Sequence, residues 1–243
     1  MSELSNYIDE YLKTEYTLKS TLKDSVQSSV YLYQKNDSAK QIVKISQKNR
    51  NDHVLRRLRG QPNKNTATIY EVCSNDEDVT VLEEYISGAT LRHIVEANGG
   101  TLKRELAVKY ALDICNGLVF IHSLGIIHRD IKPSNIIITE QGEAVIIDFG
   151  IARLTDDSKY ADTKNLGTAG YAAPEQFGIY QSGPVTDIYA VGVLLNELLL
   201  GVHPTIDTPK GKLGKVINKC IMAQMSKRYQ NVSELAEVLN KLL

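Results

Sequence analysis

The stretch His-Arg-Asp-Ile-Lys-Pro-Ser-Asn, at residues 128–135, brings chemically different groups together. It contains a carboxylate at Asp130, an ammonium at Lys132 and an amide at Asn135. Pro133 stiffens the stretch because its ring fixes φ and removes one backbone donor. A carboxylate that can accept a proton, beside a cation that can meet negative charge, is suited to phosphate chemistry. These residues therefore predict a loop that handles phosphate.

Two short apolar runs follow this loop. Ile136-Ile137-Ile138 comes first, and Val145-Ile146-Ile147 follows a turn at Gln141-Gly142 and ends on Asp148-Phe149-Gly150. Two β-branched runs around a glycine turn predict a hairpin. The hairpin would bring Asp148 back beside Asn135, so that carboxylate and amide oxygens converge on one hard cation. Oxygen ligands of this kind suit Mg²⁺.

The loop at 128–135 and the Asp-Phe-Gly at 148–150 resemble motifs of the eukaryotic-like (bacterial-type) serine/threonine protein kinases. The resemblance extends over roughly residues 16–243 and implies an α+β, bilobal protein-kinase-like fold, with a small β-rich N-lobe and a larger helical C-lobe. The expected parts are an N-terminal amphipathic helix (1–15), the N-lobe (16–84), the C-lobe (85–243), the hinge (84–90) and the activation segment (148–175).

The resemblance implies ATP and Mg²⁺ as cofactors and a protein serine or threonine hydroxyl as acceptor. Asp130 would accept the hydroxyl proton, while Lys132 and Lys44 would neutralise phosphate. The residues expected at the catalytic centre are Asp130, Lys132, Asn135 and Thr168, with Asn135 and Asp148 as metal ligands. The residues expected to bind the nucleotide are Leu22, Val30, Ile42, Lys44, Glu83, Glu84, Ile86, Ile137 and Asp148.

The nucleotide-binding region departs from the family pattern. The positions of the three loop glycines hold Lys23, Ser25 and Ser28. Glycine there lets backbone N–H groups approach the phosphates closely, so its loss predicts a different loop path or weaker nucleotide contact. Ile42 takes the place of a small alanine, and its extra volume is expected to crowd the adenine base.

Lys44 also lacks its usual partner, because no Glu lies between Lys44 and Glu71. Asn51 stands at the expected glutamate position, and the neighbouring Asp52 is expected on another side of that helix. A buried ammonium without an anion is costly, so another carboxylate should approach Lys44. Glu83 alternates with two valines along one strand face and is the predicted anion. The alternative is that Glu83 is a surface carboxylate at a strand end.

The remaining motifs concern the activation segment and the C-lobe. Arg129 is expected to receive a phosphorylated activation segment, with Thr163 as the first candidate acceptor and Ser158 as the second. Asp187 is expected to tie the catalytic loop to the lobe core, and Glu175 to pair with Arg228. After Pro204 the chain has room for at most one turn where the family has an extra helix.

The helix predicted at 3–14 carries apolar residues at spacings of three and four. Two interpretations remain open: the helix packs on the small lobe, which is favoured, or it binds a partner.

Composition narrows the class of protein. The formal net charge is −1, which argues against nucleic acid as the main partner. The three cysteines lack metal-site spacing and are expected to be reduced thiols of a cytoplasmic protein. No apolar run reaches the ~18 residues of a membrane span, and no export signal is recognisable, so membrane insertion is not expected. The oligomeric state does not follow from the sequence.

The leading hypothesis is an ATP- and Mg²⁺-dependent serine/threonine protein kinase. The alternative is a pseudokinase or very weak kinase that acts as a scaffold, favoured by the lost glycines, Asn51 and Ile42. A third interpretation is a small-molecule phosphotransferase of similar fold. Lys132 and the segment from Thr168 to Glu175 argue against it.

Overall fold

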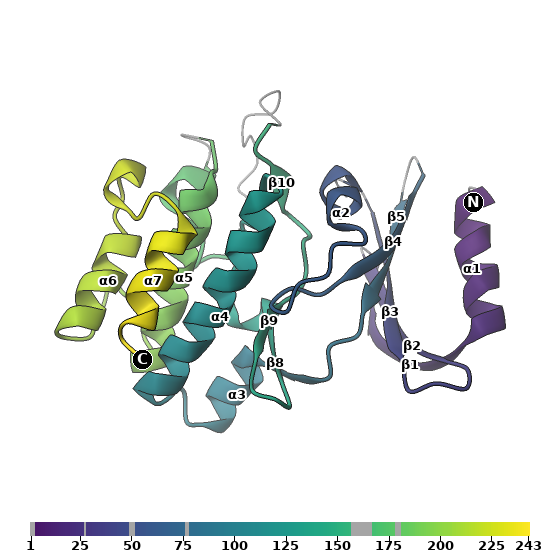
Figure 1. Cartoon of the computed structure of the whole chain (residues 1–243), viewed down its shortest axis with the longest axis horizontal. Helices are drawn as coiled ribbons and strands as arrows, with labels where there is room; N and C mark the ends of the chain where they lie inside the picture. Colours follow the sequence, from purple (N-terminus) through teal and green to yellow (C-terminus); the bar gives the residue numbers. More distant parts are fainter. Residues whose placement is uncertain (1–2, 27, 49–51, 76–77, 157–166, 178–180) are drawn as a thin grey trace. The chain divides into compact units, whose positions relative to one another are not determined.

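The structure is a computed structural model that describes residues 3–26, 28–48, 52–75, 78–156, 167–177 and 181–243 (Figure 1). The chain divides into two compact units. The first contains Met1–Asn63 and Ala67–Ile86, and the second contains Lys64–Thr66 and Ser87–Leu243. No helix among the described residues is long and apolar enough to span a bilayer.

The first unit is built on a five-stranded antiparallel sheet with strand order β1-β2-β3-β5-β4. Its elements are α1 (Glu3–Glu15), β1 (Tyr16–Asp24), β2 (Ser28–Lys35), β3 (Gln41–Lys48), α2 (Asp52–Leu58), β4 (Ile69–Ser74) and β5 (Asp78–Glu84). α1 and α2 lie on opposite sides of this sheet (Figure 1). The helix predicted at 3–14 is present as α1, and the two strands predicted after it are present as β1 and β2.

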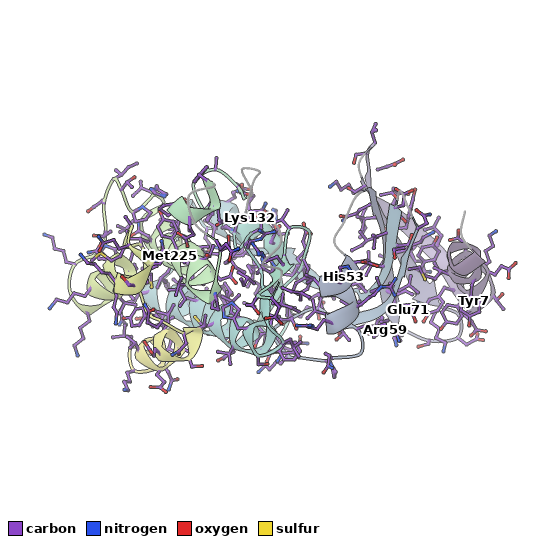
Figure 2. All side chains as sticks on the ribbon, turned by 90° about the horizontal axis from the view of Figure 1, so that it is seen from above. Tyr7, His53, Arg59, Glu71, Lys132 and Met225 are labelled. Carbon is purple, nitrogen blue, oxygen red and sulfur yellow. The ribbon has the colours of Figure 1, made fainter. Side chains whose placement is uncertain are left out.

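Helix α1 packs on the sheet through its apolar stripe. Ile8 and Leu12 are each 2% exposed and belong to a core cluster with Tyr16, Ile42, Cys73 and Leu82. Tyr7, also on α1, is 67% exposed (Figure 2). Of the two interpretations of the helix, packing on its own lobe is confirmed.

The register of β3 against β5 assigns side chains to the two faces of the sheet. Lys44 stands opposite Leu82, and Val43 stands opposite Glu83. Directly opposed residues share a face, and successive residues along a strand alternate between faces. Lys44 therefore lies on the face covered by α1, and Glu83 lies on the other face.

The second unit is mainly helical. Its regular elements are β6 (Gly88–Thr90), α3 (Leu91–Ala97), α4 (Arg104–Ser123), β7 (Ile126–Ile127), β8 (Ile136–Thr139), β9 (Ala144–Ile146), β10 (Arg153–Leu154), α5 (Pro184–Leu200), α6 (Lys212–Cys220) and α7 (Val232–Asn240). Short 3₁₀ turns occur at Pro133–Asn135, Pro174–Phe177 and Met225–Lys227. The predicted hairpin is confirmed, since Ile136 of β8 pairs with Ile146 of β9 and Gly142 adopts φ 76° in the turn between them.

Helix α5 forms the centre of this unit. A helix that is apolar on nearly all sides must be buried, and most of its residues from Val185 to Leu198 are. It ends at Gly201, whose φ of 69° gives the left-handed C-cap that glycine adopts without strain. Residues 201–211 before α6 are irregular apart from one turn at 204–206, so the expected absence of a whole additional helix at this point is confirmed.

The segment Lys64–Thr66 belongs to the second unit although it lies between α2 and β4 in the chain. The Asn65 carbonyl accepts from the Ile146 N–H at 2.9 Å, and the Asn65 side chain donates to the Ala144 carbonyl at 2.9 Å. α4 passes so close that a Cβ at Gly117 would lie 2.7 Å from the Asn65 oxygen. The segment thus completes the edge of the sheet beside β9.

Candidate active site

The loop at 128–135 is held by a buried carboxylate. Asp187, in the first turn of α5, accepts hydrogen bonds from the backbone N–H groups of His128 at 2.9 Å and Arg129 at 2.8 Å. His122 Nε2 lies 2.8 Å from the same carboxylate. Burial raises the pKa of Asp187, but the hydrogen bonds from His122 and the loop outweigh it and lower the pKa overall. The expectation that Asp187 ties the loop to the lobe core is confirmed.

Arg129 sits in a conformation that non-glycine residues rarely adopt, with φ 66°. The surroundings hold it there. Its side chain donates to the Ile151 carbonyl at 2.7 Å, and its carbonyl accepts from Gln176 Nε2 at 2.9 Å. Strain of this kind persists only where neighbouring contacts determine the backbone, as they do immediately before Asp130.

Asp130 is the centre of a closed hydrogen-bond network. The Thr168 hydroxyl donates to Asp130 Oδ1 at 2.8 Å. Lys132, labelled in Figure 2, donates to Asp130 Oδ2 at 2.7 Å and to the Thr168 oxygen at 2.6 Å. The Asn135 amide nitrogen donates to Asp130 Oδ2 at 2.9 Å and to its carbonyl at 3.0 Å. The structure thus brings together the four residues expected at the catalytic centre.

Asn135 and Asp148, the two predicted metal ligands, each carry a side-chain oxygen of the kind that suits Mg²⁺. Both hydrogen bonds of the Asn135 side chain use its nitrogen, which leaves Oδ1 available as a ligand. Asp148 is exposed, has φ 63° and accepts the Gly150 N–H at 3.0 Å. Mg²⁺ is commonly held by one or two carboxylates together with substrate phosphates and water. The described residues contain no group of three or more His, Cys, Asp and Glu arranged for a metal.

Phe149 of the Asp-Phe-Gly motif is 4% exposed and packs on His128, with ring centroids 5.3 Å apart. Burial lowers the pKa of His128. A neutral imidazole suits this apolar contact, because burying the charged form would be costly.

The segment that begins at Thr168 ends in a buried ion pair. Both terminal nitrogens of Arg228 donate to the Glu175 carboxylate, at 2.7 Å and 2.8 Å. Arg228 also donates to the carbonyls of Met222 at 2.8 Å and Val185 at 3.0 Å. The predicted pair is confirmed, and it joins the end of this segment to the helices of the second unit.

In the first unit, two serines at the positions expected for loop glycines are hydrogen-bonded to each other. The Ser25 N–H donates to the Ser28 carbonyl at 3.0 Å, and the Ser28 N–H donates to the Ser25 hydroxyl at 3.1 Å. Both amides are therefore occupied within the turn. Leu22 lies beside it, 51% exposed, where the pairing of β1 with β2 is irregular.

The prediction that Glu83 is the anion for Lys44 is wrong. The Lys44 ammonium lies 2.5 Å from Asp9 Oδ1 of α1, a residue that the sequence analysis did not consider. Glu83 is buried but lies on the opposite face of the sheet, as the register requires. Asp52 instead accepts from Arg56 at 2.9 Å and from Ser74 at 2.6 Å, in agreement with the expectation that it does not reach Lys44.

Ile42 also lies elsewhere than expected. It is 2% exposed within the cluster that α1 forms on the sheet, where its side chain packs with Ile8 and Leu12. Val30 stands opposite Ile45, on the face of Glu83. The residues expected to bind the nucleotide are thus divided between the two faces of the sheet.

The other expected nucleotide contacts have ordinary local partners. Glu84 exchanges hydrogen bonds with Thr68, whose N–H donates to its carboxylate at 3.2 Å and whose carbonyl accepts its N–H at 2.9 Å. Ile86 is half-buried, and Ile137 lies on β8 between Thr90 and Val145.

Some expectations lie outside the described residues, namely those on Asn51, Ser158 and Thr163. Two residues of the site were missed. Gln176 follows Glu175 directly and could have been suspected from that motif. Asp9 borders the buried stripe of α1, and no sequence signal indicates that it faces Lys44.

Comparison with known proteins identifies the family. Residues 14–243 match the protein kinase domain, and the chain belongs to this family. Over 235 residues it is 32% identical to a probable serine/threonine-protein kinase of Clostridium perfringens, covering 84% of this chain and 34% of that protein. A similarly named protein of Clostridium acetobutylicum is 33% identical over 207 residues, covering 74% and 31%. The serine/threonine-protein kinase PknB of Mycolicibacterium smegmatis is 40% identical over 133 residues, covering 53% and 21%.

The chain thus spans about a third of the length of the first two of these curated relatives. The fold class expected from the motifs is confirmed, with a sheet-based first unit and a helical second unit.

Proposed function

We propose that the protein is an ATP- and Mg²⁺-dependent protein kinase that transfers the γ-phosphoryl group to a serine or threonine hydroxyl. The observation that carries this proposal is the closed network of Asp130, Lys132 and Thr168. It holds one carboxylate and one ammonium in fixed positions, with a hydroxyl hydrogen-bonded to both. Phosphoryl transfer depends on such positioning and on charge stabilisation.

In this proposal Asp130 orients the acceptor hydroxyl and takes its proton. Lys132 stabilises negative charge on the transferred group, while the Thr168 hydroxyl keeps both side chains in place. Asn135 and Asp148 hold Mg²⁺, which when bound neutralises charge on the phosphates. The strained Arg129 backbone and the Asp187 anchor keep Asp130 in position before substrate arrives.

Asp130→Asn is expected to reduce phosphoryl transfer by a factor of about 100 or more, because the amide cannot accept the proton. The measurement is incorporation of radiolabelled phosphate from ATP into the protein itself and into serine- and threonine-containing peptides. Glu140→Gln, an exposed change beside the hairpin turn, is the matched control and should leave transfer unchanged. Equal transfer by Asp130→Asn and the unaltered protein would contradict the role of Asp130.

A scaffold without useful activity is the second candidate. Two observations favour it: the amides of Ser25 and Ser28 are occupied within their own turn, and Lys44 is paired with Asp9. Thermal unfolding with millimolar ATP, with and without Mg²⁺, separates the candidates. An enzyme should melt at a higher temperature only when ATP and Mg²⁺ are both present, because a ligand that binds the native state stabilises it. No shift at millimolar ATP would favour the scaffold.

A further inference from the structure

Helix α6 of the second unit presents lysines to solvent along one face. The helix lies at the edge of its unit, beside α5 (Figure 1). Its apolar side chains are buried, whereas Lys212, Lys215 and Lys219 are exposed. Residues three and four apart lie on the same side of a helix, so these three lysines form one stripe.

The stripe belongs to a segment of the chain that contains no acidic residue. Between Asp207 and Glu234 the chain has six cationic side chains and no carboxylate, although its total net charge is −1. Arg228 is paired with Glu175 in the interior. The other five cations are exposed and define what we call the lysine face: Lys210, Lys212, Lys215, Lys219 and Lys227. No carboxylate among the described residues forms an ion pair with any of them.

The backbone that carries the lysine face is held by close packing. The loop before α6 approaches the helix so tightly that a Cβ at Gly214 would overlap the Pro209 carbonyl, which fixes Lys210 beside the first turn. After the helix, Arg228 Nε donates to the Met222 carbonyl at 2.8 Å. Like charges on a fixed backbone create a positive potential that attracts anionic partners.

Exposed apolar side chains flank this face in the chain. Ile206, in the loop before α6, is 75% exposed, and Met222, just after the helix, is 41% exposed. Such side chains need no explanation when they occur alone. Beside a group of lysines, however, they supply the second of the two contributions that bind proteins to a bilayer surface, which are apolar burial and attraction to anionic lipids.

We propose that the lysine face, together with Ile206 and Met222, binds the surface of bilayers that contain anionic phospholipids. The lysines meet the headgroup charges, and the two apolar side chains enter the interface without spanning the membrane. The inference goes beyond the proposed function and does not depend on it, because vesicle binding requires neither ATP nor phosphoryl transfer.

Nucleic acid fits this surface less well. All five exposed cations are lysines, whereas arginine is the residue that forms bidentate contacts with phosphates and base edges. The Tyr229 ring is 7% exposed, and the Lys219 ammonium lies 4.0 Å from its centre, so the ring is not open to stack on a base.

The experiment uses the full chain and flotation with two kinds of vesicle. One kind is phosphatidylcholine alone, and in the other about one lipid in three is phosphatidylserine. The unaltered protein should float only with the anionic vesicles, and raised salt should release it. The triple change of Lys212, Lys215 and Lys219 to Gln should weaken this binding by about 100-fold, because each lysine beside an anionic bilayer contributes roughly fivefold.

The matched control is the triple change of Lys13, Lys19 and Lys103 to Gln. It removes the same charge from exposed positions on other elements and should weaken binding by less than about threefold. A second variant, with Ile206→Ser and Met222→Ser, tests the apolar contribution. It should weaken vesicle binding by about tenfold and leave binding to a short DNA duplex unchanged.

Equal binding to the two kinds of vesicle, or to neither, would overturn the proposal. Equal losses in the two triple variants would also overturn it, because net charge and not the lysine face would then be responsible. If the DNA duplex binds more tightly than the anionic vesicles, and the Ile206 and Met222 changes have no effect, the surface serves nucleic acid instead. If the triple variant does not fold, Lys215→Gln alone decides, with an expected loss of about fivefold.

Discussion

Asp148→Asn is expected to abolish phosphoryl transfer while the protein remains folded. The change removes a full negative charge from the proposed magnesium site without changing side-chain volume. The fold should tolerate it for two reasons. Asn adopts the left-handed conformation readily, so φ 63° is not strained further, and its Oδ1 can still accept the Gly150 N–H. The measurements are autophosphorylation with Mg²⁺ and ATP, and the melting temperature.

A closely matched control exists in the first unit. Asp37 is also an exposed aspartate with positive φ, at 59°, and lies in the turn between β2 and β3. Asp37→Asn makes the same chemical change in a similar backbone conformation and should leave transfer intact. Unchanged turnover in Asp148→Asn would show that the metal assignment is mistaken. A large drop in its melting temperature would show that Asp148 is needed for the fold instead.

Arg228→Met should be strongly destabilising, by about 3–5 kcal/mol, because it strands the Glu175 carboxylate in the interior. The side chains of Arg228 and Glu175 are 0% and 2% exposed, so water cannot replace the lost donors. The substitution also leaves the Met222 carbonyl without the Arg228 Nε–H that it accepts. Urea unfolding monitored by circular dichroism measures the free energy of unfolding of the variant and of the unaltered protein.

The comparison pair is Arg59 and Glu71, which lie side by side in Figure 2 and are joined at 2.6 Å. Their side chains are 50% and 41% exposed. Arg59→Met should therefore cost less than about 1 kcal/mol, as is usual for surface pairs. The two variants differ in whether the carboxylate left without its partner is buried. A similar loss of unfolding free energy in both would show that this burial does not matter.

The site in the second unit could be predicted from the sequence more fully than the site in the first unit. The reason is that most residues of the second site are close together in the chain, whereas those of the first are far apart. Asp130, Lys132 and Asn135 lie in one short loop, and the hairpin after it is closed by a local turn. Local spacing is therefore sufficient to bring these groups together. Thr168 and Asp187 are more distant, and their placement followed from the family motifs and not from spacing.

In the first unit the decisive quantity is strand register, which local spacing does not reveal. Alternation correctly places Glu83 with Val79 and Val81 on one face, but it does not say which β3 residues share that face. Shifting a pairing by one residue exchanges every side chain between the faces. The register observed sets Val43 opposite Glu83, and so Lys44 meets α1. Since Asp9 and Lys44 are 35 residues apart, no pattern within either element indicates that they meet.

The segment Lys64–Thr66 has a practical consequence for anyone who wishes to express the two units from separate gene fragments. A cut between Ile86 and Ser87 would leave Asn65 on the wrong fragment, away from the Ile146 N–H and the Ala144 carbonyl that it serves. The fragment that begins at Ser87 would have an open strand edge at β9 and a groove at Gly117 shaped for a missing backbone. Unpaired edges of this kind invite aggregation. A soluble second unit should therefore require residues 64–66 to be supplied, for instance by grafting them through a linker onto its N-terminus.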